Sequence, residues 1–256
     1  MRKRQRRFTR GAARASAALF AIFFLALGAQ RAPAQSDVPR PEHPRPDLVR
    51  ADWQTLNGAW EFEFDDADKG LAERWYDPSA GKRFSKSIVV PYAFQSKLSG
   101  IGDTSFHDVV WYSRALNVSQ LFGPSRRVML HFGAVDYCAG VWINGIYAGD
   151  HEGGYTPFTI DITNLLTADG AQEIVVRAED DPHDLEKPRG KQDWEVEPHS
   201  IWYPRTTGIW QTVWLEPVPH TRMTDIVWTP SLLHWALGFE TWIVGDHEEN
   251  LSLELE

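Results

Sequence analysis

The stretch Val141-Trp142-Ile143-Asn144-Gly145-Ile146-Tyr147 is the clearest local signal for the fold in this sequence. Its Asn-Gly pair supplies two residues that accept positive φ angles, which the central positions of a type I′ turn require. Apolar side chains flank the pair on both sides, so the stretch predicts a β-hairpin. An antiparallel sheet is therefore the expected setting of the residues around it.

Outward from this hairpin, short runs alternate apolar and polar residues with period two, and Gly, Pro, Asn or Asp bounds each run. The nine candidate strands are residues 60–64, 87–91, 110–118, 127–132, 141–144, 158–162, 173–178, 209–216 and 225–228. One short helical signal lies around residues 161–166, where Thr163 or Asp161 could cap a single turn. A (β/α)₈ barrel needs eight alternations of strand and helix over about 250 residues, and no such alternation occurs. The sequence predicts an all-β domain.

The amino-terminal residues have the layout of a signal peptide. The first fourteen residues carry seven basic side chains and no acid, and residues 15–29 form an uncharged apolar run. Such a run is shorter than the ~20 residues of a spanning helix, and Ala32-Pro33-Ala34 follows it as a small-x-small cleavage signal. We expect residues 1–34 to be removed and the mature chain to be exported to the periplasm or the medium. The alternative is an uncleaved membrane anchor.

The remaining chain divides into three parts. Residues 35–47 carry four prolines among charges, which predicts an extended, unpacked linker. Residues 48–219 hold most of the candidate strands and form the main predicted domain. After Pro217 and Pro219 interrupt any strand, a new alternating run begins near Met223. Residues 220–256 could supply two or three strands, too few to close a sandwich core of their own.

The charge and the polar residue types exclude several classes of partner. Beyond residue 34 the chain keeps 18 Lys and Arg against 35 Asp and Glu, a formal net charge of −17. This charge repels nucleic acid and anionic lipid, whereas a neutral sugar is indifferent to it. The histidines show no metal-ligand spacing and no glycine loop cradles phosphate, so we expect no metal and no cofactor. The alternative is a Ca²⁺ ion held by loop carboxylates such as Asp103, Asp108 or Asp180.

Several longer motifs occur in a fixed order along the chain. They are LNGAWEF at 56–62, VP at 90–91, WYSR at 111–114, HFGAVDY at 131–137, VWING at 141–145, HEGGYTPFTIDIT at 151–163 and TGIWQTVWL at 207–215. Together, over about residues 46–219, they resemble the sugar-binding domain of family 2 glycoside hydrolases, which include β-galactosidase and β-glucuronidase. The resemblance implies a jelly-roll, galactose-binding-domain-like β-sandwich. It also implies that residues 220–256 are the incomplete start of an immunoglobulin-like sandwich.

The resemblance also implies a function. In that family two catalytic glutamates lie on a barrel, and the motifs for both are absent from this sequence. We therefore expect the amino-terminal sugar-binding portion of an exported glycosidase, inactive alone, whose partners are a carbohydrate and the missing barrel. The alternatives are a stand-alone carbohydrate-binding module and a protein-binding adhesion sandwich. Retaining glycosidases need two carboxylates about 5 to 5.5 Å apart. The pairs Glu195/Glu197 and Asp180/Asp181 fall in a segment rich in charge and proline, which favours a solvated loop over a catalytic site.

Two positions depart from the family pattern. β-Galactosidase and β-glucuronidase commonly place an aspartate six residues before the glycine of the Thr-Gly-Ile turn, and here that position is Trp202. β-Galactosidase also places an asparagine two residues after the Val-Pro motif, and here that position is Ala93. The two losses imply a preference for a sugar other than galactose or glucuronic acid, or no activity.

Twelve tryptophans suit a sugar-binding domain, because sugars lay their apolar faces on aromatic rings. We expect the strand residues Trp60, Trp142, Trp210 and Trp214 in the core, where large aromatics fill sandwich interiors. The loop of residues 187–205 instead mixes aromatics with polar groups, and long loops tend to be functional. The candidate sugar-binding or barrel-facing residues are Asp193, Trp194, Trp202, Tyr203 and Arg205. The alternative for them is packing against a missing domain, and no residue of this chain is assigned a catalytic role.

Overall fold

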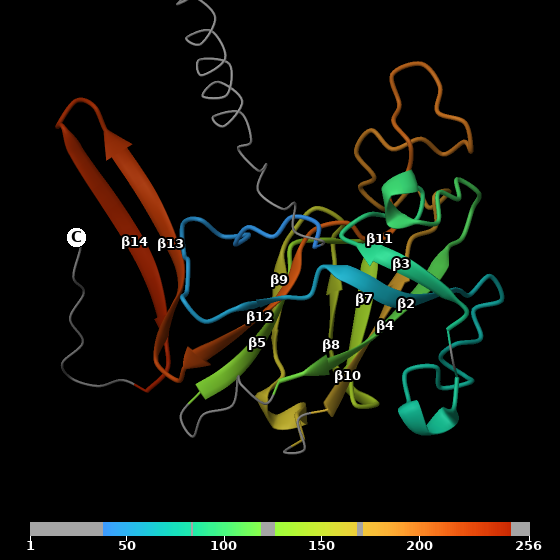
Figure 1. Cartoon of the computed structure of the whole chain (residues 1–256). Coiled ribbons are helices and arrows are strands. Elements are labelled where there is room, and N and C mark those ends of the chain that lie inside the picture. Colours follow the sequence, from blue (N-terminus) through green and yellow to red (C-terminus); the bar gives the residue numbers. More distant parts are fainter. Residues whose placement is uncertain (1–37, 83, 119–125, 168–170, 247–256) are drawn as a thin grey trace, which may run out of the picture. The chain divides into compact units, whose positions relative to one another are not determined.

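Two antiparallel sheets form most of the structure (Figure 1). The computed structural model describes residues 38–82, 84–118, 126–167 and 171–246. The expected signal peptide of residues 1–34 lies outside these ranges. The four-stranded sheet has the order β1 (Gln54–Thr55), β12 (Val213–Pro219), β5 (Arg126–Phe132) and β9 (Phe158–Asp161). The six-stranded sheet has the order β3 (Lys86–Val90), β2 (Gly58–Phe64), β4 (Val109–Asn117), β10 (Ala171–Glu179), β7 (Cys138–Ile143) and β8 (Ile146–Glu152).

The smaller elements connect or extend these sheets. Two short ladders pair β6 (Val135–Asp136) with β11 (Gly208–Ile209) and β13 (Arg222–Ser231) with β14 (Ala236–Val244). The single-turn 3₁₀ helices are η1 (Pro78–Ala80), η2 (Lys97–Ser99) and η3 (Thr163–Leu165). Among the described residues no helix is long and apolar enough to cross a membrane.

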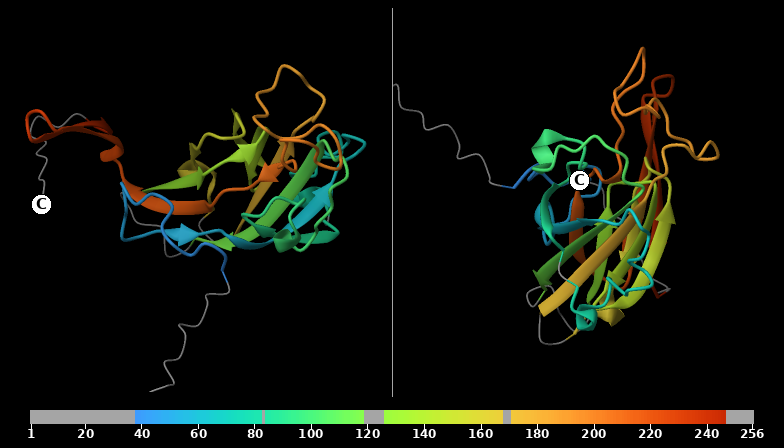
Figure 2. Two further views of the ribbon diagram at one scale, coloured as in Figure 1. Left: turned by 90° about the horizontal axis from the view of Figure 1, so that it is seen from above. Right: turned by 90° about the vertical axis from the view of Figure 1, so that its right-hand side faces the viewer.

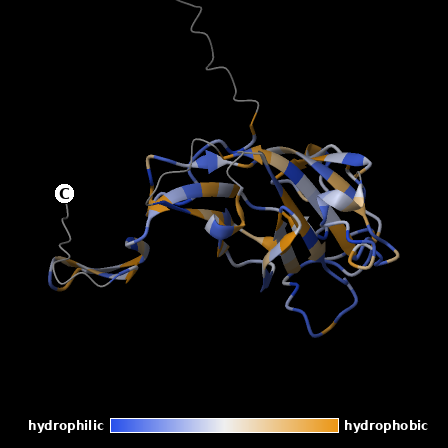
Figure 3. Cartoon of the chain, turned by 90° about the horizontal axis from the view of Figure 1, so that it is seen from below, coloured by the Kyte–Doolittle hydropathy of each residue, from blue (hydrophilic) through white to orange (hydrophobic). Residues whose placement is uncertain are grey.

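The core lies between the two sheets. Alternate side chains of each strand point inward, so that Phe62 and Tyr112 of the six-stranded sheet belong to one buried cluster with Leu130 and Phe132 of the four-stranded sheet. Each fully buried side chain of this size contributes about 1.5 to 3 kcal/mol relative to an exposed one. Further views show the two layers and the apolar residues concentrated on their strands (Figures 2 and 3). The prediction of an all-β sandwich is confirmed.

The hairpin predicted from the Asn-Gly pair is present. Asn144 and Gly145 have φ angles of 53° and 80°, and Ile143 pairs with Ile146 across the turn between β7 and β8. The Asn144 side chain also donates hydrogen bonds to Leu165 O and Gln172 Oε1, at 2.9 and 2.7 Å. Strand β8 was not among the nine candidate runs, because it is an edge strand whose exposed residues do not alternate clearly.

The described part of the predicted linker lies against the sandwich and is not unpacked. Asn57 Nδ2 donates to the carbonyl oxygens of Pro39 and Arg40, at 3.1 and 3.3 Å. The His43 ring packs edge-on against Trp53, with 4.8 Å between ring centroids. Bends and turns shape its backbone, Arg40 has a positive φ angle of 49°, and His43 Nε2 lies 3.2 Å from Glu216 Oε1 of the four-stranded sheet.

Each of the four strand tryptophans has a different environment. Trp60 lies in the core between the sheets, and Trp142 belongs to a second buried cluster with Trp75 and Trp111. Trp214 is also buried, stacked on His131. The prediction of a core position is wrong for Trp210, which lies half-buried between β11 and β12, where the chain leaves one ladder and joins the next.

The hairpin β13–β14 pairs only with itself among the described strands. Three of its tryptophans, Trp228, Trp235 and Trp242, are 44%, 91% and 50% exposed. Two strands without a packed second layer do not make a domain core. The assignment of residues 220–256 to the start of an immunoglobulin-like sandwich stays a prediction, and its last ten residues lie outside the described ranges.

Candidate functional site

The loop of residues 180–207 connects β10 to β11 and projects from one end of the sandwich (orange in Figures 1 and 2). Most of its residues are hydrophilic (Figure 3), with Leu185, Val196 and Ile201 exposed among them. Backbone hydrogen bonds close it on itself: Asp193 N donates to Tyr203 O and Tyr203 N donates to Lys191 O, each at 2.9 Å. All five residues predicted for the site therefore lie on an ordered loop.

Asp193 organises this loop from within. Its side chain is buried and accepts hydrogen bonds from His199 N at 2.7 Å and from Glu195 N at 3.1 Å. His199 Nδ1 lies 2.8 Å from the same carboxylate. Burial opposes ionisation of Asp193, but these hydrogen bonds together lower its pKa below the ordinary value. The structure thus places Asp193 beneath the loop surface.

Trp194 and Trp202 form an aromatic cluster inside the loop. Their rings meet edge to face, with 5.2 Å between centroids, and the Arg189 guanidinium lies 4.6 Å from the centroid of the Trp194 ring. Cation–π and edge-to-face contacts each contribute on the order of 1 kcal/mol. The two tryptophans therefore support the shape of the loop, and neither lines the cavity found at the base of the loop.

The loop cavity has a volume of about 280 Å³ and opens between the loop and the end of the sandwich. Its lining combines aromatic rings with polar groups from the loop, β6 and the segments that follow β8 and β11. The main lining residues are Asp136, Tyr155, Gln192, Tyr203, Thr206 and Trp210. Tyr155 and Tyr203 are 51% and 62% exposed, so their rings are available to a ligand.

Gln192 fixes the polar side of the loop cavity. Its Nε2 donates to Asp136 Oδ2 at 2.7 Å and to the Tyr155 hydroxyl at 3.0 Å. Its Oε1 accepts from Thr206 N at 2.6 Å, and the Tyr155 hydroxyl donates to Arg189 O at 2.8 Å. One amide therefore orients a carboxyl, a phenol and the loop backbone around the same space.

Asp136 supplies the carboxyl group at the base of the loop cavity. Burial raises its pKa to about 7, and repulsion from Asp180 adds to the increase, while the hydrogen bond from Gln192 opposes it. Gly154 allows this placement, since a Cβ there would lie 2.1 Å from Asp136 Oδ1. A carboxyl group that titrates near neutral pH can accept a hydrogen bond from a ligand hydroxyl or, when protonated, donate one.

Arg205 points away from the loop cavity. Only 7% of the residue is exposed, and its guanidinium lies 4.4 Å from the centroid of the Phe106 ring. Burial lowers the pKa of Arg205, and the nearby carboxylates Asp180, Asp108 and Asp181 oppose that shift. This arginine therefore offsets the acidic charge beneath the loop.

The other carboxylates of this region have structural partners or face solvent. Asp180 Oδ2 accepts a hydrogen bond from Thr207 Oγ1 at 2.8 Å, and Glu195 and Glu197 are exposed on the loop. Within the described ranges, no group of three or more His, Cys, Asp or Glu side chains is arranged to hold a metal ion.

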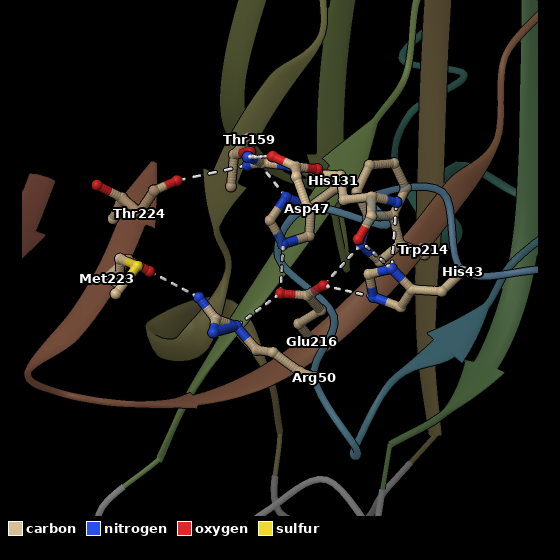
Figure 4. A network of polar contacts seen from close by, with 10 residues as sticks. His43, Asp47, Arg50, His131, Thr159, Trp214, Glu216, Met223 and Thr224 are labelled. Atoms are coloured by element: carbon tan, nitrogen blue, oxygen red, sulfur yellow. Dashed lines mark hydrogen bonds and ion pairs between the residues drawn. The ribbon is translucent and has the colours of Figure 1, made fainter. Parts of the chain in front are cut away.

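A second polar region lies on the outer face of the four-stranded sheet, centred on Glu216 (Figure 4). This carboxylate accepts from Trp214 Nε1 at 3.1 Å and from Arg50 Nε at 3.0 Å, and it lies 3.2 Å from His43 Nε2 and 3.6 Å from His131 Nε2. Burial opposes ionisation of Glu216, but these partners, His131 foremost, lower its pKa to about 2. Glu216 thus ties residues 38–50 to the sheet.

The sequence identified only part of this geometry. Of its five candidates, Tyr203 lines the loop cavity, and the other four support the loop or the charges beneath it. Asp136 and Tyr155 were not singled out, and Trp210 was assigned to the core, although each lies in one of the motifs quoted above. The spacing of those motifs indicates a fold, but it does not indicate which of their polar side chains face a cavity.

Comparison with known proteins gives consistent matches. A family model described as glycosyl hydrolases family 2, sugar binding domain, matches residues 53–216. The β-galactosidase of Thermoanaerobacter pseudethanolicus is 27% identical over 179 residues, which cover 68% of this chain and 21% of that protein. The β-glucuronidase of Canis lupus familiaris is 33% identical over 117 residues, 43% of this chain and 18% of that protein.

A solved structure shows the same fold. A β-glucuronidase from Ruminococcus gnavus, in complex with D-glucaro 1,5-lactone, aligns with a TM-score of 0.62 and 21% sequence identity. The alignment covers 78% of this chain and 36% of that one. The chain therefore spans about a fifth to a third of the length of the relatives it matches.

Proposed function

Because the chain belongs to glycosyl hydrolase family 2, with the sugar-binding domain of that family at residues 53–216, we propose that it is the sugar-binding portion of an exported glycosidase that hydrolyses O-glycosyl bonds. The loop cavity carries this proposal. Tyr155, Tyr203 and Trp210 surround a polar base of Asp136 and Gln192. Sugars bind where aromatic rings take their apolar faces and fixed polar groups take their hydroxyls.

Binding and bond cleavage are separate tasks in this proposal. The loop cavity binds or borders the saccharide, and the catalytic carboxylates lie on the barrel that the family resemblance implies. The chain alone would bind a sugar without hydrolysing it.

The proposal includes export and a sugar preference of its own. The basic leader and the apolar run of residues 15–29 support cleavage after Ala34 and export. Trp202 and Ala93 stand where the family commonly has an aspartate and an asparagine. Their substitution supports a sugar other than galactose or glucuronic acid.

The test compares two tyrosines of similar exposure on different faces. Tyr203 lines the loop cavity, whereas Tyr147 lies on edge strand β8 and is 53% exposed. Glycan-array screening of the purified chain would identify a bound sugar, and calorimetry would give its dissociation constant. We expect Tyr203→Ala to raise that constant roughly tenfold, equivalent to about 1.4 kcal/mol, and Tyr147→Ala to leave it unchanged.

Other outcomes would favour a different function. Equal losses in Tyr203→Ala and Tyr147→Ala would remove the loop cavity from the proposal. Binding to a protein but to no glycan would support an adhesion sandwich. Glycan binding by a chain whose gene has no barrel beyond the codon for Glu256 would support a stand-alone binding module.

A further inference from the structure

A larger cavity, of about 600 Å³, lies over the four-stranded sheet beside the Glu216 network. We call it the sheet cavity. Its floor includes His131 of β5, Thr159 of β9 and Trp214 of β12, and its walls include Arg45 of the segment before β1 and Thr224 of β13. Its volume lies within the ~300 to 1,000 Å³ typical of ligand sites. It shares no lining residue with the loop cavity.

The floor of the sheet cavity is held rigidly (Figure 4). The His131 ring stacks on the Trp214 ring, with 4.7 Å between centroids and 10° between planes. His131 Nδ1 lies 2.8 Å from Thr159 Oγ1, and Trp214 Nε1 donates to Glu216. A floor whose rings are fixed from below loses little conformational freedom when a ligand binds.

The walls carry charges of both signs that are already paired. Arg45 donates to Asp225 Oδ1 at 3.3 Å and to Thr224 O at 3.4 Å, so it links the amino-terminal segment to β13. Arg40 Nε donates to Glu42 Oε1 and Arg40 Nη1 donates to Gln211 Oε1, each at 3.4 Å. The paired charges leave little net field in the cavity, which favours a neutral ligand over an ion.

The sheet cavity continues into a smaller and more apolar space of about 250 Å³. The two spaces share Arg45, His131, Thr159 and Thr224. The smaller one adds the apolar side chains Leu48, Met129, Val218 and Val244, together with the charged side chains Arg50, Arg222 and Glu216. Together they form a groove along the outer face of the sheet. A groove with a polar end and an apolar end suits a ligand longer than one sugar ring.

We propose that the sheet cavity is a second saccharide site, which binds a neutral oligosaccharide independently of the loop cavity. Hydroxyls of Thr159 and Thr224 and the amide of Gln211 can pair with sugar hydroxyls, while the His131 ring and the proline side chains of the lining offer apolar surface. The ligand class is that of the proposed function, but the site is different. An experiment can therefore disprove either site without disproving the other.

The experiment fills one site and truncates the other. Thr159 is exposed on the cavity floor, so Thr159→Trp occupies the space with little disturbance of the core, and Gln211→Ala removes a wall amide without adding bulk. The probes are cellotetraose, xylotetraose, mannotetraose and β-1,4-galactotetraose, with tetragalacturonate as the anionic comparison. Saturation-transfer difference NMR and calorimetry would be run on the full chain, on both variants and on Tyr203→Ala. Melting temperatures would check that each variant is folded.

We expect at least one neutral tetrasaccharide to bind the wild type and Tyr203→Ala, with a dissociation constant at least ten times higher in Thr159→Trp and several times higher in Gln211→Ala. Binding lost in Tyr203→Ala but unchanged in Thr159→Trp would overturn the sheet site and leave the loop cavity standing. Binding lost only in Thr159→Trp would support the sheet site and leave the loop cavity to its own test, the comparison of Tyr203→Ala with Tyr147→Ala. Preference for tetragalacturonate, or binding to none of the neutral probes, would overturn the sheet site.

Discussion

Asp136 and Glu216 are both buried carboxyl groups, 2% and 4% exposed, yet their pKa values shift in opposite directions, to about 7 and about 2. Burial alone disfavours the charged form in both cases. The Asp180 carboxylate repels the charged form of Asp136 and raises its pKa further. The hydrogen bond from the Gln192 amide is the main contact that lowers it. Glu216 instead meets Arg50, two histidines and an indole N–H. The partners, and not the depth of burial, decide whether a buried acid is charged.

The two regions are therefore built for different tasks. Around Glu216, a permanent charge holds residues 38–50 and the sheet in one arrangement. Around Asp136, a carboxyl group near its titration point can follow the hydrogen-bonding needs of a ligand. Changing each carboxyl group in turn measures how far this contrast holds.

The largest expected effect comes from removing the charge at the centre of the sheet network. Glu216→Leu leaves Arg50 and two histidines without their common partner, and we expect a loss of roughly 3 to 5 kcal/mol in the free energy of unfolding. Urea denaturation at pH 7 measures it. Glu42→Gln is the matched control, since Glu42 pairs with Arg40 in solvent and such pairs contribute about 0 to 1 kcal/mol. Equal losses in both variants would show that the buried network contributes no more to the free energy of unfolding than the exposed ion pair does.

The next effect is the pH dependence that Asp136 imposes. Its folded pKa is raised, so between about pH 4 and pH 7 the unfolded chain has released a proton that the folded chain retains, and stability falls as pH rises. We expect titration of Asp136 to lower the free energy of unfolding by about 3 kcal/mol between pH 5 and pH 8, and Asp136→Asn to abolish that loss. Urea denaturation across this range tests it. An unchanged pH slope in Asp136→Asn would assign the loss to another group.

Glu216 sets the opposite sign at lower pH. Its folded pKa is depressed, so its contribution is complete above its ordinary value of 4.5 and is lost as pH falls toward about 2. The same denaturation series, extended to pH 3, should therefore show stability decreasing again on the acid side. Glu216→Gln should flatten that acid limb without changing the slope between pH 5 and pH 8.

The smallest expected effect comes from Gly154, whose backbone lies against the Asp136 carboxyl group. Gly154→Ala places a methyl group against the Asp136 carboxyl, and we expect about 1 to 3 kcal/mol of destabilisation as the two separate. Gly238→Ala is the control, because a Cβ at that position meets only ordinary contacts, the nearest at 3.5 Å. Thermal unfolding of the two variants compares them. Equal melting temperatures would mean that the Asp136 carboxyl moves aside without cost.

Local patterns predicted the strands well and individual environments less well. The Asn-Gly turn was predictable because positive φ angles depend on the two residues themselves. Trp210 was misplaced because alternation continues through residues 209–216, although the chain changes partner strand between β11 and β12. Period-two alternation assigns a side chain to a face of a strand, but it carries no information on which sheet that strand joins.

By itself, the sequence determined the all-β class, the central hairpin, most strand positions and the family, because turns, alternation and ordered motifs are encoded in neighbouring residues. Tertiary structure decided which carboxyl groups are charged and which aromatics are accessible. Glu216 meets residues as distant in sequence as His43 and His131, and Asp136 meets Asp180 and Gln192. A pKa depends on all charges and donors within a few ångströms, and only the packed chain brings those groups together.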